Sequence, residues 1–250
     1  MVVSDRAPTR LPEEVVWHDL ECGGYRADLP LWHELAERCG GRVLDVGAGS
    51  GRVTLQLARA EHAVTALDRS DVLLRALRER ADEPSVEAVC ADARSFALPE
   101  RDFALCLVPM QTIQLLGGPE GRAAFLRCAL AHLQPGGVLA VALSSELEPY
   151  EVLDGGPAPM PDVLERDGVL YASQPLAVLE EPDGYVLQRR RETVDARGER
   201  SVVANEIRLD RLTASELEGE ALDLGFTSAR RDQISATADY VGSEVVIVGV

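Results

Sequence analysis

The sequence predicts a doubly wound α/β fold whose seven-stranded sheet is interrupted by an antiparallel β insertion between strand 5 and the last helix. Two observations support this prediction. From residue 42 to 143, short apolar runs alternate with amphipathic segments, which is typical of a parallel sheet covered on both faces. Residues 144–211 break that rhythm with longer strand-like runs. We therefore expect one α/β domain from residues 42–143 and 212–250, an inserted β subdomain from 144–211, and an N-terminal segment from 1–41.

The first stretch contains five short apolar runs, which are the predicted parallel strands: Arg42–Val46, Ala63–Leu67, Val86–Cys90, Asp102–Val108 and Gly137–Leu143. Three segments between them have helical character: Arg52–Ala60, Ser70–Ala81 and Glu120–Leu133. Ser70 is a helix-capping residue type at the start of the second segment. In the third, apolar residues recur at helical spacing and form one stripe.

The predicted insertion opens with a Pro/Gly-rich stretch, Glu148–Pro161, which we expect to be a loop or hinge without regular structure. Three strand-like runs follow, separated by turn signals, and predict an antiparallel meander: Val169–Leu179, Tyr185–Val194 and Val202–Leu209. Thr213 and Glu216 then form a capping box that opens the last helix, and Gly225 ends it. Two closing runs, near Phe226–Ile234 and Glu244–Val250, complete the sheet.

Composition excludes several classes of function. The formal charge is −17, whereas binding to DNA or RNA needs clustered positive charge, so we expect no nucleic-acid partner. All 25 basic residues are arginines. Schiff-base catalysis and the phosphate-binding loop of P-loop proteins both require a lysine, and both are therefore excluded.

Cysteine and histidine spacing predicts neither a metal site nor a disulfide framework. The five cysteines are widely spaced without a C-x-x-C pair, and the four histidines are scattered. The apolar runs are too short to span a bilayer, so we expect no membrane partner. Acidic residues near the N-terminus stand where a secretory signal is basic and then apolar, which predicts a cytoplasmic protein.

The strongest chemical signal is a glycine-rich turn, Gly47-Ala-Gly49-Ser-Gly51, directly after the first strand. Glycines allow the backbone to turn tightly and approach a ligand, and the following helix start offers free N–H groups. Asp68 ends the next strand, where an acid accepts hydrogen bonds from ribose hydroxyls. In the dinucleotide-binding motif the third glycine would stand at position 52, but this chain has Arg52 there and Gly51 one residue earlier. The pattern predicts a nucleoside ligand other than NAD.

Four segments resemble the class I S-adenosylmethionine-dependent methyltransferases, small-molecule type. Val43–Arg59 looks like motif I of that family, and Asp68 stands where its ribose-binding acid stands. Asp92 matches the acid that meets the adenine amino group, and Leu133–Val138 resembles the turn into the fifth strand. The resemblance covers about residues 30–143 and 213–250, and it implies a Rossmann-like fold and S-adenosyl-L-methionine as cofactor.

By this resemblance, the glycine loop packs against the methionine part of the cofactor, Asp68 holds the ribose, and Asp92 with Ala93 holds the adenine. Related enzymes cover the cofactor with an N-terminal segment that often carries a Tyr or Arg, which points to Tyr25 and Arg26. The expected cofactor-binding residues are Asp45, Gly47, Ala48, Gly49, Gly51, Asp68, Arg69, Asp92, Ala93, Tyr25 and Arg26.

The acceptor side is expected beyond the fourth strand, because ligands of open α/β sheets lie outside the carboxyl ends of the strands. Met110, Gln111 and Thr112 follow that strand and should face the transferring methyl group. The Asp/Asn-Pro-Pro-Tyr/Phe motif of nucleic-acid amino methylation is absent at this point. The sequence singles out no catalytic base among five candidates: His18, His33, Tyr25, Tyr150 and Tyr171.

The predicted function is transfer of a methyl group to a nitrogen or oxygen of a small-molecule acceptor. Two alternatives stay open: a non-catalytic module that binds S-adenosylmethionine, and another transferase that uses the same cofactor. The insertion is expected to act as a lid or a substrate subdomain, or to contact a second copy in a homodimer. The identity of the acceptor, the choice among nitrogen, oxygen and carbon, and the oligomeric state are not decided by the sequence.

Overall fold

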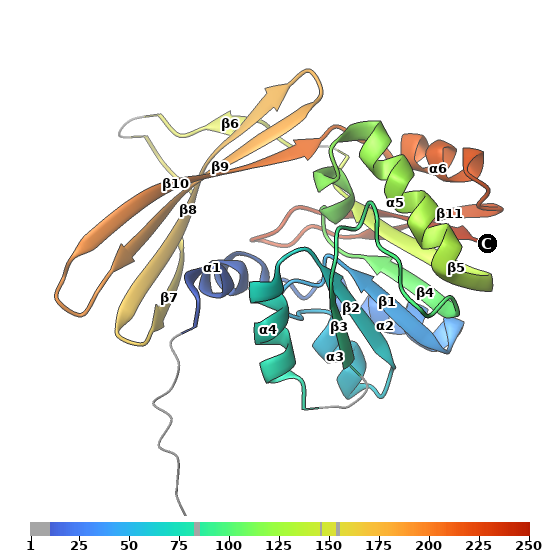
Figure 1. Cartoon of the computed structure of the whole chain (residues 1–250). Coiled ribbons are helices and arrows are strands. Elements are labelled where there is room, and N and C mark those ends of the chain that lie inside the picture. The colour runs from blue at the N-terminus through green and yellow to red at the C-terminus, as the bar shows by residue number, and fades with distance from the viewer. Residues whose placement is uncertain (1–10, 83–85, 146, 154–155) are drawn as a thin grey trace, which may run out of the picture.

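The computed structural model has two β-sheets with helices packed around the larger one (Figure 1). It describes residues 11–82, 86–145, 147–153 and 156–250. Residues 1–10 of the predicted N-terminal segment and residues 146 and 154–155 of the predicted insertion lie outside the described residues. The smaller sheet projects from one side of the larger one, and the chain returns from it to finish the larger sheet.

The larger sheet confirms the predicted doubly wound fold, with seven strands in the order β11-β12-β5-β4-β1-β2-β3. Neighbouring strands from β5 to β3 are parallel, and β12 is antiparallel to both β5 and β11. The strands are β1 Arg42–Val46, β2 Val64–Asp68, β3 Val86–Cys90, β4 Phe103–Val108, β5 Leu133–Leu143, β11 Ser228–Ile234 and β12 Ser243–Gly249. β5 begins at Leu133 and so includes the segment predicted as a turn.

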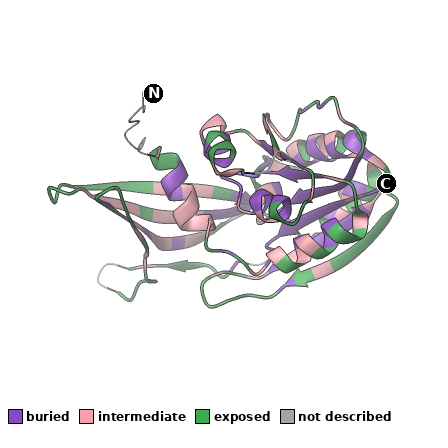
Figure 2. Cartoon of the chain, turned by 90° about the horizontal axis from the view of Figure 1, so that it is seen from below, coloured by how far each residue is buried: buried purple, intermediate pink, exposed green. Residues whose placement is uncertain are grey.

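Alternate residues of each central strand supply the two faces of the core. Val43 packs with helices α2 and α3 on one face, while Leu44 packs with α5 and α6 on the other. Figure 2 shows this sheet as the most deeply buried part of the chain. The helices are α1 Glu13–Cys22, α2 Leu29–Cys39, α3 Thr54–Arg59, α4 Asp71–Arg80, α5 Gly118–His132 and α6 Ala214–Asp223, with a 3-10 helix η1 at Thr112–Leu115.

Helix starts follow the predicted caps. The Ser70 hydroxyl accepts a hydrogen bond from the Leu73 amide at the start of α4. Thr213 and Glu216 form the complete capping box of α6. Helix α3 begins at Thr54 rather than at Arg52, because Gly51 has φ 98° and the glycine turn continues to Val53 before the helix starts.

The smaller sheet is the predicted meander with two additional strands. Its order is β10-β9-β8-β6, and β7 also pairs with β8. The strands are β6 Tyr150–Glu151, β7 Asp162–Arg166, β8 Val169–Glu181, β9 Gly184–Val194 and β10 Arg200–Asp210. The expectation that Glu148–Pro161 contains no regular structure was wrong at β6, because Tyr150 and Glu151 pair with Val178 and Ala177 of β8 despite their Pro/Gly-rich neighbours.

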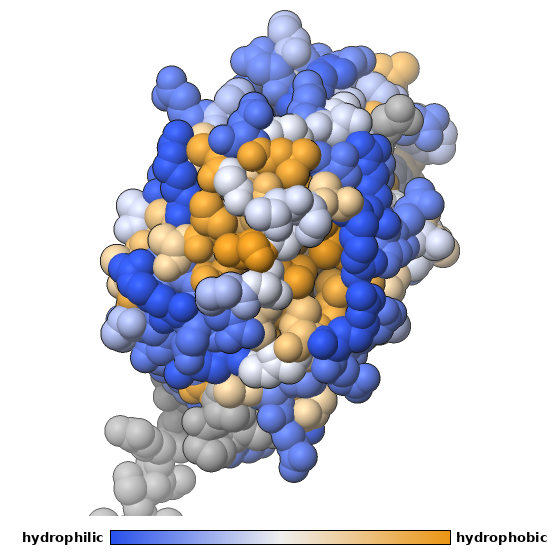
Figure 3. All heavy atoms as spheres, turned by 90° about the vertical axis from the view of Figure 1, so that its right-hand side faces the viewer, coloured by the Kyte–Doolittle hydropathy of each residue, from blue (hydrophilic) through white to orange (hydrophobic). Residues whose placement is uncertain are grey.

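Helix α1 lies between the two sheets (Figure 1). It contacts α4 of the larger domain on one side and β7 and β8 of the smaller sheet on the other. On the side of the molecule away from the smaller sheet, apolar residues gather in the middle of the surface and hydrophilic residues surround them (Figure 3). Within the described residues, no helix combines the length and apolar character that crossing a membrane requires.

Candidate active site

A cavity of about 480 Å³ lies beyond the carboxyl ends of β1, β2 and β4 and extends beneath the smaller sheet. This is the place where open α/β sheets bind ligands. Ten of the residues predicted for the site line it: Asp45, Gly47, Ala48, Asp68, Arg69, Asp92, Ala93, Met110, Gln111 and Thr112. Helix α1 adds lining residues that the sequence analysis did not assign to the cofactor, among them Trp17 and Glu21.

Two glycines of the loop are required by the protein around them. Gly47 has φ 75°, and a Cβ there would lie 2.6 Å from a methyl carbon of Thr112. Gly49 has φ 55°, and a Cβ there would lie 2.3 Å from Nε2 of His18. Any side chain at either position would therefore clash as well as strain the backbone. Thr112 and His18 therefore lie in contact with the main chain of the glycine loop, and both line the cavity.

Asp68 holds the glycine loop and still has room for a ligand. One carboxylate oxygen accepts a hydrogen bond from the Gly49 amide at 2.8 Å, and the other accepts one from the Ser70 amide at 2.8 Å. An ionised carboxylate has about four acceptor positions on its two oxygens. Each oxygen of Asp68 therefore keeps an acceptor position for a hydroxyl group in the cavity.

Asp45 is a buried acid with one unsatisfied oxygen. The Thr54 hydroxyl donates to its Oδ2 at 2.6 Å, while Oδ1 has no hydrogen-bond partner among the described residues. The residue is 1% exposed, and this burial raises the pKa of Asp45 to about 6. A buried acceptor left open at a cavity wall is suited to a donor brought by a ligand, such as an ammonium or hydroxyl group.

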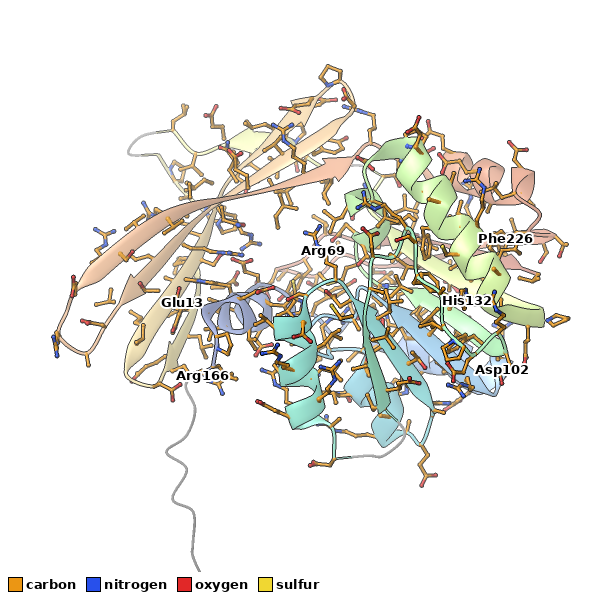
Figure 4. The ribbon with its side chains drawn as sticks, in the orientation of Figure 1. Glu13, Arg69, Asp102, His132, Arg166 and Phe226 are labelled. Carbon is orange, nitrogen blue, oxygen red and sulfur yellow. The ribbon has the colours of Figure 1, made fainter. Side chains whose placement is uncertain are left out.

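Asp92 lies at a more open part of the cavity. Its carboxylate pairs with Arg94 at 2.6 Å, and the hydrogen bonds from Arg94 lower the pKa of Asp92 to about 2. Arg69 follows Asp68 and has no ion pair within the described part of the chain. In Figure 4 it lies between the larger sheet and the smaller one.

His18 is the only one of the five predicted base candidates that lines the cavity. Its Nδ1 lies 3.1 Å from the Ser50 hydroxyl oxygen, and that hydroxyl donates its single proton to Asp19 at 2.6 Å. Nδ1 must therefore carry the imidazole proton and donate it to Ser50, which leaves an acceptor lone pair on Nε2 beside Gly49. Burial lowers the pKa of His18 below its ordinary value and keeps the ring neutral at pH 7.

Asp19 orients His18 indirectly, because it accepts a hydrogen bond from the Ser50 hydroxyl that contacts the imidazole. Arg80 of α4 donates to both carboxylate oxygens of Asp19, at 3.0 and 2.6 Å. The chain of contacts Arg80–Asp19–Ser50–His18 joins α4, α1 and the glycine loop. The local sequence of α1 does not predict these contacts, because Asp19 is separated from Ser50 by 31 positions and from Arg80 by 61.

Four predicted cofactor residues lie outside the cavity lining. Gly49 and Gly51 belong to the loop behind it, and Arg26 borders a separate shallow depression with Gly51. Tyr25 is 4% exposed and packs between the Tyr240 ring at 5.0 Å and the Arg52 guanidinium at 5.1 Å. Their roles toward a cofactor stay predictions.

Arg52 lines the cavity and also binds the N-terminal segment through Asp28. Its guanidinium makes two 2.6 Å hydrogen bonds to Asp28, which is fully buried and also accepts from the Trp32 indole at 2.8 Å. This residue replaces the third glycine of the dinucleotide motif. It docks the start of α2 directly onto the glycine loop.

At the other end of the cavity, Met110, Gln111 and Thr112 stand where the sequence placed them, after β4. Met110 has φ 56°, a conformation that non-glycine residues seldom adopt. The Gln111 amide donates to the Ser144 hydroxyl at 3.0 Å. The end of η1 and the smaller sheet add lining residues that were not predicted individually: Leu115, Leu116, Leu187, Arg191, Ile207 and Leu209.

Comparison with known proteins agrees with this geometry. Residues 43–137 match the family model for the methyltransferase domain. This segment, which is less than half of the chain, therefore resembles a methyltransferase domain. The domain is similar to a cypemycin N-terminal methyltransferase from a Streptomyces species, with 30% identity over 149 residues. That match covers 59% of this chain and 60% of the relative.

Solved structures share the fold over almost the whole chain. The amino pentose methyltransferase CalS10 of Micromonospora echinaspora superposes with a TM-score of 0.70 at 21% identity, covering 93% of this chain and 96% of its own. The sugar N-methyltransferase KedS8 of a Streptoalloteichus species gives a TM-score of 0.69 at 15% identity, covering 100% and 96%. The fold of the methyltransferase domain together with its β insertion is therefore one that solved methyltransferases also have.

The described residues contain no cluster of His, Cys, Asp or Glu side chains that could hold a metal ion. The residues fit S-adenosylmethionine: Asp68 has open acceptor positions, Asp45 has an unsatisfied oxygen, and the loop between them carries no side chain at Gly47.

Proposed function

We propose that this protein transfers the methyl group of S-adenosylmethionine to a nitrogen or oxygen of a small-molecule acceptor. The observation that carries the proposal is the continuity of one cavity. It runs from Asp45 and Asp68, beside the glycine loop, past Gln111 to the inner face of the smaller sheet. A donor and an acceptor can therefore meet in one cavity, as methyl transfer requires.

In this proposal the cofactor is held by the carboxyl ends of β1 and β2. Asp68 accepts from ribose hydroxyls, the open oxygen of Asp45 and Nε2 of His18 accept from donors on the cofactor, and Asp92 borders the adenine end. When bound, the cofactor supplies an electrophilic methyl group on a sulfonium. The protein's residues hold the acceptor in line with that group and exclude water.

The acceptor loses a proton when it is methylated, and an amine must be neutral before it can attack. A cavity that ended at the cofactor would favour the alternative, a non-catalytic binding module. Here the cavity continues beyond Gln111 to Leu187 and Ile207, which supports an enzyme.

The names of the relatives support the same chemistry: one is a cypemycin N-terminal methyltransferase, one an amino pentose methyltransferase and one a sugar N-methyltransferase. The test is mass spectrometry of mixtures of protein, S-adenosylmethionine and a panel of amine and hydroxyl acceptors. We expect an acceptor that gains one methyl group together with formation of S-adenosylhomocysteine. Asp68→Ala should abolish the product, while Asp71→Ala, at the partly exposed start of α4, should not. Cofactor binding with no methylated product in any mixture would favour the binding module.

A further inference from the structure

The far end of the cavity has walls of one chemical type. Leu187 of β9 and Ile207 and Leu209 of β10 form its roof. Leu115, the last residue of η1, and Leu116, which follows it, form the opposite side. We call these five side chains the acceptor slot. Strand pairing sets Ile207 directly opposite Leu187, so the two side chains project from the same face of the smaller sheet toward the larger domain.

Leu115 is 50% exposed and lines the cavity together with the apolar side chains of the smaller sheet. Ligand pockets are lined mostly by apolar side chains, and a ligand in the slot would cover Leu115. The opposite face of β10 differs: Val202, which lies five residues before Ile207 and therefore points to the other face, is outside the cavity lining.

Charges near the acceptor slot are already neutralised. Arg191 of β9 makes hydrogen bonds of 2.8 and 2.6 Å to Glu21 of α1, and its guanidinium lies 5.3 Å from the Trp17 ring centroid. Glu21 also accepts from the Ser173 hydroxyl at 2.7 Å. This pair closes the end of the slot between α1 and β9 and leaves no net charge there.

Of the other arginines of the cavity, Arg52 is paired with Asp28 and Arg94 with Asp92. Arg69, which lies between the two sheets in Figure 4, is left as a single cation without an ion pair among the described residues. Recognition of a diphosphate requires several convergent cations or main-chain N–H groups. The described residues of the acceptor slot provide neither.

Resting on the proposed function, we infer that the acceptor presents an apolar, uncharged body to this slot, as a ring- or chain-bearing amine or alcohol does. A sugar carried on a nucleoside diphosphate does not match the slot, because its two phosphates would lie against leucine and isoleucine side chains without a compensating charge. Desolvating those phosphates without partners is strongly unfavourable. The slot thus selects against the diphosphate-linked class and in favour of a hydrophobic acceptor.

The test measures binding to the full chain saturated with S-adenosylhomocysteine, so that the cofactor end is filled. The probe is N-phenyl-1-naphthylamine, an uncharged apolar amine whose fluorescence rises in apolar surroundings, and thymidine diphosphate is the competitor. We expect saturable fluorescence that thymidine diphosphate does not displace. Ile207→Asp should weaken probe binding by about tenfold or more, because the probe would then contact an unpaired carboxylate. Val202→Asp, a carboxylate on the other face of the same strand, should leave it unchanged.

A second variant keeps the inference testable if Ile207→Asp does not fold. Leu115→Asp changes a half-exposed side chain on the opposite wall and should also weaken the probe about tenfold. Unchanged probe affinity in both variants, or displacement of the probe by thymidine diphosphate, would overturn the inference. A thermal shift with S-adenosylhomocysteine is recorded for each protein. Its absence from the unmodified chain would count against the proposed function, whatever the probe does.

Discussion

The two ends of the cavity are built on different principles. At the cofactor end, main chain and acids from adjacent strands form a dense polar network in which Asp68 fixes the Gly49 and Ser70 amides at 2.8 Å. At the acceptor end, apolar side chains from β9, β10 and η1 face one another, and the single ion pair Glu21–Arg191 connects α1 to the smaller sheet. Polar partners at fixed positions orient a cofactor, whereas the shape of an apolar wall selects an acceptor. Four variants should separate the two ends.

Asp68→Ala should have the largest effect. It removes the predicted ribose acceptor and releases two main-chain amides of the glycine loop, so we expect the dissociation constant for S-adenosylhomocysteine to rise about 100-fold, or about 3 kcal/mol. Isothermal titration calorimetry measures this, with Asp71→Ala as the matched acid, a partly exposed residue of α4 outside the cavity lining. Equal affinities in the two variants would remove Asp68 from the cofactor site.

Glu21→Gln should act on stability and spare the cofactor. Glu21 is only 7% exposed in its pair with Arg191, so the variant leaves a half-buried guanidinium without its counter-charge. We expect a loss of about 2 kcal/mol in the free energy of unfolding by urea. The affinity for S-adenosylhomocysteine should stay within about twofold. A large loss of affinity would show that the two ends are not independent.

Asp45→Asn should change stability and binding in opposite directions. The pKa of Asp45 is about 6 in the folded chain, above its ordinary value of 3.8, so ionisation of this acid costs stability as pH rises from about 4 through 6. The asparagine variant should therefore be more stable than the parent at pH 8, by roughly 1–3 kcal/mol.

Cofactor affinity should follow the reverse pattern in the same variant. If the open oxygen of Asp45 accepts from an ammonium group, Asp45→Asn weakens S-adenosylhomocysteine binding about tenfold at pH 8. In the unmodified chain, binding should also weaken as pH falls below about 6 and Asp45 becomes protonated. Affinity that is unchanged by the substitution and flat from pH 5 to 8 would argue against this contact.

His18→Leu should give the smallest of the four effects, a loss of about fivefold in S-adenosylhomocysteine affinity, because one neutral acceptor is removed. Nitrogen NMR of the labelled imidazole tests the tautomer directly. We expect a protonated Nδ1 and an unprotonated Nε2, as the Ser50–Asp19 contacts require. The opposite tautomer would mean that the Ser50 hydroxyl does not donate to Asp19.

The sequence predicts the cofactor end of this molecule far better than the acceptor end. Gly47, Asp68 and Gln111 follow strand ends, and parallel strands bring such positions to one edge of the sheet, so local spacing was enough to gather them. The caps at Ser70 and Thr213 were predictable from local sequence as well.

Long-range contacts account for what the sequence did not predict. Glu21 meets Arg191 across 170 positions, and His18 reaches the glycine loop only because α1 is held between α4 and the smaller sheet. The strand β6 was missed because Tyr150 and Glu151 are fixed by pairing with β8 and not by local propensity. Tyr25 was named because related enzymes often carry a Tyr or Arg in the N-terminal segment; the structure places it against Tyr240 and Arg52, and its role toward a cofactor stays a prediction.

The most direct test of the account is the thermal shift of the unmodified chain with S-adenosylhomocysteine, with NAD as the control. A ligand that binds only the folded state at about 100 times its dissociation constant stabilises that state by about 2.7 kcal/mol. For a chain of this size we expect a rise in Tm of roughly 5–10 °C with S-adenosylhomocysteine and none with NAD. No rise with S-adenosylhomocysteine, or a rise with NAD alone, would contradict the assignment of the glycine loop, Asp45 and Asp68 to this cofactor.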